Sequence, residues 1–404
     1  MGDVELRVAR ADEHDLISGL FGAAMMFDAS PDDLGRQLFE PERALVATDG
    51  DELIGTTRAL TRELSVPGAV IDAAHVTGVG VRATHRRRGV MSSLIGRQLR
   101  EVPEAIAVLW ASEPAIYGRF GYGSAAREAS YEVDLHHVGP PNDRIRPGAL
   151  GVLTVDEAIK ELPSVLRRLQ EQRAGVSGRS ELLWQKHLQD KAEYRNGRTA
   201  QQILVHRDAD GTIDGYALWR GKMNWLPSGS PANEVYVEEL AAPDPTAYRE
   251  LWQHLLTMDL SAKLVYGHAS VDEPLQQLVR MPTSLDRRLG DSLWVRVTDV
   301  PRALQQRRYA APLDVVLDVT DELIAANTGR FRLTADETSA TCGPTNDPAD
   351  LSLTTTELGA TYLGDRSLAE FATTGRVVEH TPGALTRTAT ALRWPLGPVS
   401  LEIF

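Results

Sequence analysis

The chain has 404 residues, of which 42% are hydrophobic, and this is enough for two or three domains with sizeable cores. Its 56 Asp and Glu residues outnumber its 43 Lys and Arg residues, and the formal net charge of -13 argues against nucleic acid as the main partner. The single cysteine, Cys342, excludes an internal disulfide and any zinc site built from several cysteines.

The first residues are charged, and the sequence contains no apolar stretch of about 18 residues, so we expect neither a signal peptide nor a membrane span. A cytoplasmic protein is the expectation, with export without a recognisable signal peptide as the alternative. The acidic balance suits a cationic small substrate, although many intracellular enzymes are acidic without having one.

Strand and helix patterns alternate through the first 140 residues. Asp49-Gly50 between two apolar runs is typical of a hairpin. The apolar residues that follow Gly89 are spaced for one buried helix face. The order of elements predicts an α/β domain with a mixed sheet. The predicted segments are a strand at 4–8, helices at 11–26 and from 32, strands at 44–48, 53–64 and 73–81, a helix from 90, a strand at 105–110, a helix at 114–120 and strands from 127.

Glycines and prolines between 139 and 148 predict a linker, and a second unit begins near Gly151. Pro163 predicts a break in its first helix. Residues 235–247 repeat the strand, turn and helix pattern of 79–90, with Asp244 in place of an arginine run. We interpret this as a degenerate repeat that lost a phosphate site; chance similarity is the alternative. The predicted segments are helices at 157–173, 182–188 and 245–258 and strands at 200–206, 215–220 and 234–240.

A third, α+β unit begins at Leu293, with strands expected at 315–319, 329–333 and 349–353 and helices at 356–363 and 367–373. The chain ends in an apolar segment, 399–404. This ending predicts either a docked last strand or a terminal carboxylate with a role in the chemistry.

The basic turn at 86–88 is the strongest candidate for a binding site. Backbone N–H groups at a helix N-terminus attract phosphate, Gly89 lets a ligand approach closely, and Arg86, Arg87 and Arg88 add positive charge. The strand residues Val79, Gly80 and Val81 could pair with the amides of a pantetheine arm if the sheet is splayed there. The turn therefore predicts a site for the pyrophosphate of an acyl-coenzyme A; a solvated arginine cluster is the alternative.

Two groups of motifs resemble known families. Residues 86–91 resemble the Arg/Gln-x-x-Gly-x-Gly/Ala signature of the GNAT N-acetyltransferases, with Met91 at the last position. Residues 81–89, 111–113 and 116–123 resemble the Eis (enhanced intracellular survival) acetyltransferases of actinobacteria. That resemblance implies an α/β (α+β) chain with an acetyl-CoA-binding GNAT domain (1–140), a GNAT-like domain without a cofactor site (148–292) and a sterol-carrier-like domain (293–404). It also implies aminoglycoside acetylation, a role in antibiotic resistance and a homohexamer.

Acetyl transfer to an amine needs a proton donor for the departing thiolate and an acceptor for the amine proton. Tyr117, on the short helix after the 105–110 strand, suits the donor role, which the resemblance also assigns to it; Tyr122 is the alternative. The resemblance assigns the acceptor role to the terminal carboxylate of Phe404. Cys342 lies in a polar stretch and is not expected to be a nucleophile.

The predicted cofactor contacts are made by the strand, the basic turn, the helix start and the Ala111–Glu113 motif. They are Val79, Gly80, Val81, Arg86, Arg87, Arg88, Gly89, Val90 and Ser112. The predicted substrate contacts are Asp28, Trp110 and Glu402, with Phe27 as a further wall; no metal is expected. The predicted function is acetyl-CoA-dependent acetylation of aminoglycosides or similar polyamines. The alternatives are acetylation of protein lysine or a polyamine, and non-catalytic ligand or lipid binding.

Overall fold

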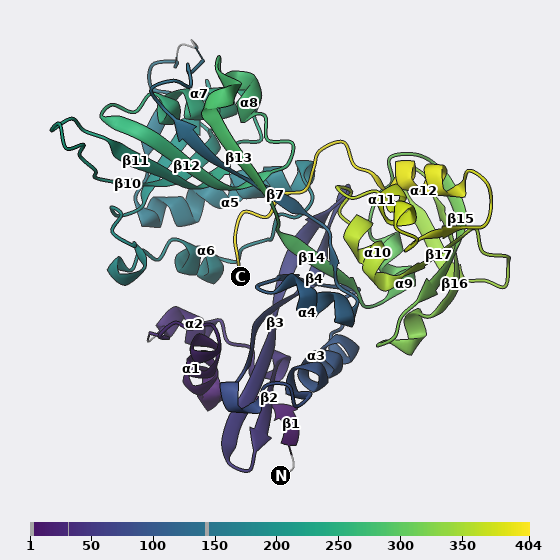
Figure 1. Cartoon of the computed structure of the whole chain (residues 1–404). Coiled ribbons are helices and arrows are strands. Elements are labelled where there is room, and N and C mark those ends of the chain that lie inside the picture. Colours follow the sequence, from purple (N-terminus) through teal and green to yellow (C-terminus); the bar gives the residue numbers. More distant parts are fainter. Residues whose placement is uncertain (1–3, 31, 142–144) are drawn as a thin grey trace. The chain divides into compact units, whose positions relative to one another are not determined.

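The computed structural model describes residues 4–30, 32–141 and 145–404 (Figure 1). Two compact units are formed from discontinuous parts of the chain. Unit 1 contains the chain up to residue 125, residues 293–395 and Phe404; unit 2 contains residues 126–292 and 396–403. In the part of the chain that the structure describes, no helix is long and apolar enough to cross a membrane.

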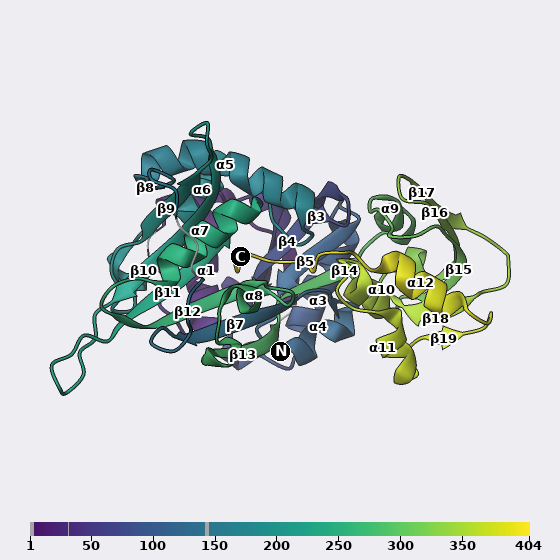
Figure 2. The ribbon, with the colours of Figure 1, turned by 90° about the horizontal axis from the view of Figure 1, so that it is seen from above.

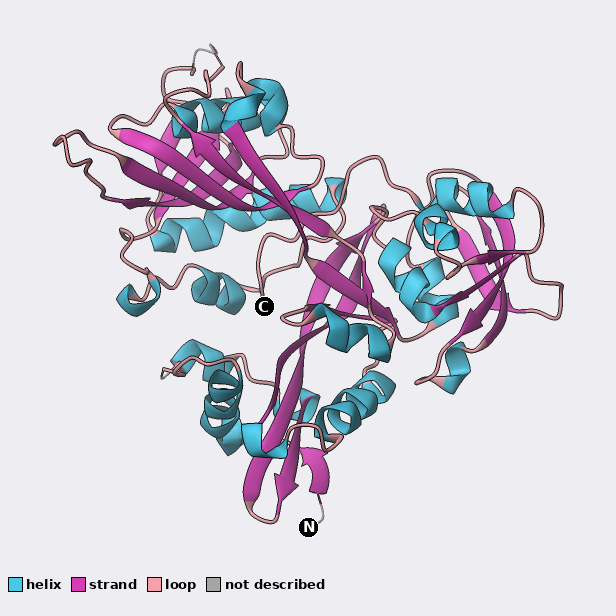
Figure 3. Ribbon diagram, viewed as in Figure 1, coloured by secondary structure: helices cyan, strands magenta, loops and turns pink. Residues whose placement is uncertain are grey.

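The first sheet of unit 1 has the strand order β1-β2-β3-β4-β5-β14-β6. Helices α1 (His14–Ala24) and α3 (Val90–Glu101) cover opposite faces (Figure 3). Gly80 of β4 faces Leu20 and Ala24 of α1, whereas Gly55, which pairs with Val81, faces α3. The other elements are β1 (Val4–Val8), α2 (Asp33–Gln37), β2 (Ala44–Asp49), β3 (Glu52–Val66), β4 (Ala69–Val81), β5 (Ile106–Trp110), α4 (Pro114–Tyr117), β6 (Gly123–Ser124) and β14 (Leu293–Val297).

The second sheet, in unit 2, has the order β13-β7-β12-β11-β10-β9-β8. Helices α5 and α7 lie on its two faces (Figure 1), and each buries a hydrophobic core. The elements are β7 (Arg127–Asp134), β8 (Leu150–Val152), α5 (Val155–Gln172), α6 (Glu181–His187), β9 (Gln202–Arg207), β10 (Ile213–Lys222), β11 (Asn233–Ala241), α7 (Pro245–Leu256), β12 (Ser261–Ser270), α8 (Leu275–Leu278) and β13 (Leu285–Asp291).

The first two sheets exchange strands: chain order would place β7 in the first sheet and β14 in the second, but the pairing is the reverse. β7 follows β6 in sequence but pairs with β12 and β13, and β14 follows β13 but pairs with β5 and β6. The crossings fall between Ala125 and Ala126 and between Ser292 and Leu293. Reading the chain in order does not anticipate this exchange, because it depends on pairing between residues more than 120 positions apart.

The predicted break at Pro163 is wrong, because α5 runs without interruption from Val155 to Gln172. A proline inside a helix costs about 3 kcal/mol relative to alanine. Leu162, Val165 and Leu166 on either side of it are buried in the core of unit 2, and burying such side chains contributes about 1.5–3 kcal/mol each. The packing of this stripe offsets the missing backbone hydrogen bond.

The third sheet belongs to unit 1 and has the order β17-β16-β15-β18-β19. Figure 2 shows α10, α11 and α12 beside it. Its elements are α9 (Val300–Gln305), β15 (Leu313–Thr320), β16 (Gly329–Ala335), β17 (Ala340–Pro344), β18 (Leu351–Thr354), α10 (Thr355–Thr361), α11 (Leu368–Thr373), β19 (Val378–Glu379) and α12 (Ala384–Leu392). Three mixed sheets with helices confirm the predicted α/β (α+β) class.

The apolar end of the chain is not a strand: residues 399–404, all of them described, have no regular secondary structure. Val399 and Leu401 are buried in unit 2, and the Val399 N–H donates to the Ala174 carbonyl at 2.9 Å. The expectation of a last strand is therefore wrong. The segment is anchored by its side chains and single hydrogen bonds rather than by a sheet ladder.

Candidate active site

The first sheet opens between two parallel strands. β4 and β5 pair at Ala74↔Ala107 and His75↔Val108, after which β4 continues to Val81 without a described partner on that side. On its other side β4 pairs with β3 through a bulge at Gly78, whose φ is 61°. The end of β4 therefore presents backbone N–H and C=O groups toward the opening, as the predicted pairing with a pantetheine arm requires.

The basic turn leads directly into α3. Arg87 and Gly89 have φ values of 60° and 83°, a left-handed conformation that suits glycine and strains an arginine. The first intrahelical hydrogen bond runs from Ser93 N–H to the Gly89 carbonyl at 2.9 Å, and no described side chain caps the helix. The N–H groups at 90–92 are thus left for an anion, supported by the helix dipole.

A cavity of about 500 Å³ joins this turn to α4. Eight of the nine predicted cofactor contacts line it, namely Val79, Gly80, Val81, Arg86, Arg87, Gly89, Val90 and Ser112. Arg88 is not among the described lining residues; its guanidinium lies 3.6 Å from the Asp49 carboxylate. Ala24 and Met25 at the end of α1 contribute to the wall, which sequence reasoning missed because they lie more than 50 residues from the turn.

Tyr117 lines the same cavity at the end of α4. Its side chain is buried. Burial and the nearby Glu113 carboxylate raise the pKa of the Tyr117 hydroxyl, and a hydrogen bond with Ser112 opposes part of that rise. The hydroxyl is therefore protonated throughout the neutral range. Tyr122 packs edge-on against Tyr117, with ring centroids 6.0 Å apart, but is fully buried, and its hydroxyl has no partner among the described residues.

The loop that follows Tyr117 packs closely against β14 and α10. Gly121 has a φ of 80°, and a Cβ there would meet the guanidinium of Arg296 at 2.8 Å. A Cβ at Gly123 would lie 2.1 Å from the Thr356 carbonyl of α10. Arg296 is itself buried and paired with Asp321 at 2.7 Å. Gly121 is thus required by the buried Arg296 side chain of β14, and Gly123 by the close approach of α10.

Phe404 lies in unit 1 against β4. Its ring centroid is 4.6 Å from that of His75, and the Arg62 guanidinium carbon lies 5.9 Å from the Phe404 ring. His75 is fully buried, donates a hydrogen bond from Nδ1 to the Ala73 carbonyl at 3.0 Å, and pairs with β5 at the point where the sheet opens. His75 and Arg62 were missed from the sequence, although a histidine inside an apolar strand is a signal that could have identified the first.

None of the three predicted substrate contacts is among the described residues that line the 500 Å³ cavity. Asp28 is exposed after α1, as is Phe27, and Trp110 is half-buried at the end of β5; none of these lines the 500 Å³ cavity in the described structure. Glu402 lies in unit 2, 3.3 Å from Arg179 and 3.6 Å from His187.

Glu402 belongs to a buried charge network rather than to an open pocket. Arg179 also pairs with Glu239 at 2.7 Å, and His187 lies 2.9 Å from the same carboxylate. Burial opposes ionisation of Glu239, but Arg179 and His187 outweigh it and hold the pKa of Glu239 well below its usual range. Glu402 therefore ties the tail to unit 2. Cys342 is half-buried and burial raises the pKa of its thiol to about 12, which fits the expectation that it is not a nucleophile.

No metal-binding cluster of three or more His, Cys, Asp or Glu side chains occurs within residues 4–30, 32–141 and 145–404.

Three family models match the chain in succession. An acetyltransferase (GNAT) domain matches residues 5–125, a second acetyltransferase (GNAT) domain matches 175–297, and a sterol carrier protein domain matches 300–399. The predicted combination of two GNAT domains and a sterol-carrier-like domain is confirmed.

Relatives similar over most of the chain carry the same assignment. An uncharacterized N-acetyltransferase of Streptomyces avermitilis is 38% identical over 98% of both chains. The N-acetyltransferase Eis of Mycobacterium tuberculosis is 30% identical over 85% of this chain and 84% of its own. The crystal structure of Eis1 from Mycobacterium abscessus superposes with a TM-score of 0.85, 30% identity and full coverage of both chains.

These likenesses favour an enzyme over the non-catalytic alternative, and they cover the residues that form the cavity as well as both other domains. The chain therefore belongs to the Eis family of GNAT N-acetyltransferases.

Proposed function

We propose that the protein transfers an acetyl group directly from acetyl-CoA to amino groups of aminoglycosides or similar polyamines. One observation carries this proposal. A single cavity is lined both by the elements that suit a pyrophosphate, which are Arg86, Arg87 and the start of α3, and by Tyr117, a buried and protonated hydroxyl.

The residues present fit acetyl-CoA in three respects. Gly89 has its left-handed φ and no Cβ, and the ideal Cβ position there is open space, so a phosphate can approach the N–H groups at 90–92. Arg86 and Arg87 supply positive charge at the same place. The unpaired edge of β4 at 79–81 offers backbone partners for the two pantetheine amides.

The reaction forms an amide C–N bond and breaks the thioester C–S bond, and acetyl-CoA supplies the activated acyl group. The attacking amine must be neutral and gives up one proton, and the departing thiolate takes one. We assign the second proton to the Tyr117 hydroxyl, which regains it from solvent. The predicted role of the Phe404 carboxylate as acceptor of the amine proton stays a prediction, as do substrate contacts at Asp28, Trp110 and Glu402.

An aminoglycoside or polyamine is the proposed substrate class because the chain is acidic overall and because relatives in the family are N-acetyltransferases. The test is a thiol-release assay with acetyl-CoA across kanamycin, spermidine, a lysine-containing peptide and a neutral sugar. We expect release with kanamycin or spermidine, with product masses that give the number of acetyl groups added. Release with the peptide alone would support the protein-lysine alternative, and no release with any amine would contradict the proposal.

The predicted homohexamer and the predicted cytoplasmic location stay predictions. Light scattering of the purified chain tests the first, because a hexamer would have six times the 44.3 kDa chain mass. A role in antibiotic resistance is tested by the kanamycin sensitivity of cells that express the chain.

A further inference from the structure

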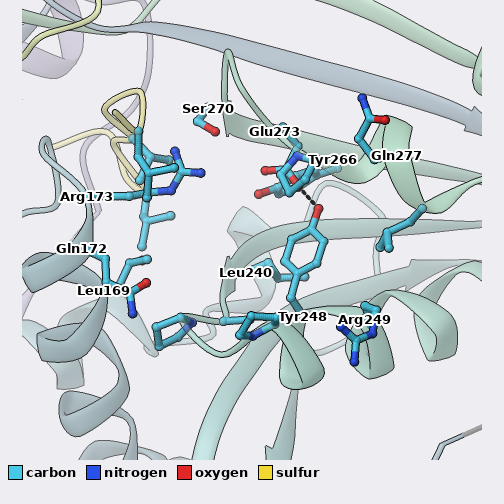
Figure 4. Close-up of a pocket in the computed structure, with 18 residues that line it drawn as sticks. Leu169, Gln172, Arg173, Leu240, Tyr248, Arg249, Tyr266, Ser270, Glu273 and Gln277 are labelled. Carbon is cyan, nitrogen blue, oxygen red and sulfur yellow. Dashed lines mark hydrogen bonds between the residues drawn. The ribbon is translucent and has the colours of Figure 1, made fainter. Parts of the chain in front are cut away.

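Unit 2 contains a second opened sheet with a cavity of its own. β11 and β12 pair in parallel from Asn233↔Ser261 to Val237↔Tyr266, and beyond that point β11 continues to Ala241 and β12 to Ser270. A cavity of about 400 Å³ lies there, a size typical of small-molecule sites (Figure 4). Apolar side chains from four parts of unit 2 line it, including Leu169, Leu240, Leu278, Leu396, Val399 and Leu401.

This cleft is unsuited to the pyrophosphate of acetyl-CoA. Asp244 caps α7 with its own carboxylate, accepting from the N–H groups of Thr246 at 2.7 Å and Ala247 at 3.1 Å. Pro245 at the first helical position has no N–H. The N-terminus of α7 therefore carries a negative charge and has its exposed donors in use, which repels an anion. The ligand that fits the rest of the cavity must have other chemistry.

The cavity holds one buried carboxyl group, that of Glu273, which forms no ion pair among the described residues, although Arg173 and Arg249 also line the cavity. Glu273 is 7% exposed and accepts a hydrogen bond from the Tyr248 hydroxyl. None of the ion pairs among the described residues includes Glu273. The nearby Arg173 is engaged elsewhere: its Nη1 lies 2.7 Å from the Asp272 carboxylate and 2.8 Å from the Gly397 carbonyl. Figure 4 shows the Tyr248–Glu273 pair on one side of the cavity and Arg173 on the other.

We propose that this cleft binds a small organic monoamine, with the apolar body against the leucines of the cavity and the ammonium group at the Glu273 carboxylate. An ammonium ion at Glu273 supplies the ion-pair partner that this carboxylate lacks and up to three donors, whereas an anionic group placed there would be repelled by it. The proposal concerns unit 2 and does not depend on acetyl transfer in unit 1.

Among the described titratable groups around the cavity, Glu273 is the one whose pKa lies near neutral pH. Burial raises the pKa of Glu273 to about 7. Burial also raises the pKa of each neighbouring tyrosine, so these stay neutral, and Arg173 holds the pKa of Asp272 below its usual range despite burial, so Asp272 stays ionised. The charged and titratable groups that face Glu273 are Tyr248, Tyr266, Tyr131, Asp272 and Arg173, and Arg249 is a further cation that lines the cavity.

Because the amine binds the ionised form of Glu273, its affinity must follow the ionised fraction. That fraction rises from about one tenth at pH 6 to about nine tenths at pH 8 for a pKa near 7, so the affinity should rise about tenfold over this range. At pH 7, binding should release about half a proton per site, because bound amine holds Glu273 ionised.

The test is titration calorimetry of the full chain, without acetyl-CoA, using 2-phenylethylamine and the neutral alcohol 2-phenylethanol. We expect the amine to bind tenfold or more tightly than the alcohol at pH 8, and Glu273→Gln to remove that preference. Repeating the pH 7 titration in two buffers of different ionisation enthalpy measures the proton release without any mutation, so the test holds even if the variant fails to fold.

Equal binding of amine and alcohol by the unmodified chain would overturn the proposal. So would an affinity for the amine that a folded Glu273→Gln variant keeps, or binding at pH 7 that releases no proton. Amine that binds elsewhere in the chain would keep its affinity in the Glu273→Gln variant, so this variant distinguishes the two locations.

Discussion

Tyr117 and Tyr122 lie five residues apart on one loop, and both are buried with raised pKa values. What separates them is access. Tyr117 lines the cavity and is hydrogen-bonded to Ser112, whereas Tyr122 is fully buried in the hydrophobic core beside the first sheet and has no described partner for its hydroxyl. A proton donor must reach the thiolate, so exposure to the cavity decides between two residues that sequence alone could not distinguish.

Tyr117→Phe should lower kcat by about 100-fold or more, within the range for loss of a general acid, with little change in the KM for acetyl-CoA. The matched control is Tyr122→Phe, which removes a buried hydroxyl without a partner and should leave kcat within about twofold. Thiol release at saturating acetyl-CoA measures both. Equal losses in the two variants would show that packing of the aromatic pair, rather than the Tyr117 hydroxyl, supports turnover.

The pH profile of kcat tests the same residue differently. Since burial raises the pKa of Tyr117, the acid form persists above the ordinary tyrosine pKa of about 10. We therefore expect no decline in kcat attributable to Tyr117 between pH 7 and about pH 10. A decline centred near pH 8 that disappears in Tyr117→Phe would contradict this assignment.

At the scale of elements, the basic turn and α3 act together, because the conformation of Gly89 aims the N–H groups of the helix into the cavity. Gly89→Ala places a Cβ in the left-handed region, at a cost of about 1–2 kcal/mol. If the turn distorts to relieve that strain, the KM for acetyl-CoA should rise roughly five- to thirtyfold with kcat less affected.

Gly211 offers a matched control for this variant. It has a φ of 85° and open space at its Cβ position, as Gly89 does, but it lies in a hairpin turn of unit 2. Gly211→Ala should lower the melting temperature without changing the KM for acetyl-CoA. A raised KM in both variants would mean that general destabilisation, not the cavity, is being measured.

A second device at this scale is the charge network that joins β11, α6 and the tail. Arg179 and Glu239 are both about 1% exposed, so removing one charge leaves the other buried and unpaired. Glu239→Gln should lower the free energy of unfolding by about 3–5 kcal/mol, measured by urea denaturation. The half-exposed pair Arg332–Asp314 is the control, and Asp314→Asn should cost at most about 1 kcal/mol.

The same network predicts a pH dependence of stability. The pKa of Glu239 in the folded chain lies well below its value in the unfolded chain, about 4.3, so the unfolded state binds the extra proton. The stabilisation is therefore complete above about pH 4.3 and is lost as pH falls toward the lower folded-state pKa. Glu239→Gln should flatten this acid-side loss, and an unchanged slope below pH 4.3 would contradict the assignment.

At the scale of the whole molecule, the sequence predicts those parts of the site whose residues are neighbours in the chain. The turn at 86–89 and its helix are one segment, so their geometry follows from residue type and spacing. The approach of α1 to the cavity, the contact of His75 with Phe404 and the exchange of β7 and β14 depend on long-range pairing, which periodicity does not specify. Glu402 illustrates the limit: its charge is visible in the sequence, but its partners Arg179 and His187 are more than 200 residues away.

The tail connects the two units: residues 396–403 belong to unit 2, and Phe404 belongs to unit 1. In unit 2 the tail is held by Arg173, Asp272 and the Val399–Ala174 hydrogen bond. In unit 1 the Phe404 ring rests on His75. The role of the Phe404 carboxylate as acceptor of the amine proton stays a prediction, and this placement of the ring allows the ring and the carboxylate to be tested separately.

Two variants separate the Phe404 ring from its carboxylate. Appending Gly-Ser-Gly after Phe404 keeps the ring but moves the carboxylate away, and it should lower kcat by at least about tenfold, as loss of a general base does, while acetyl-CoA binding by calorimetry is unchanged. Phe404→Leu keeps the carboxylate and loses the aromatic contact with His75, so it should retain more activity than the extended chain. If the extended chain turned over normally while Phe404→Leu did not, the ring rather than the carboxylate would be the functional group, and solvent would have to accept the amine proton.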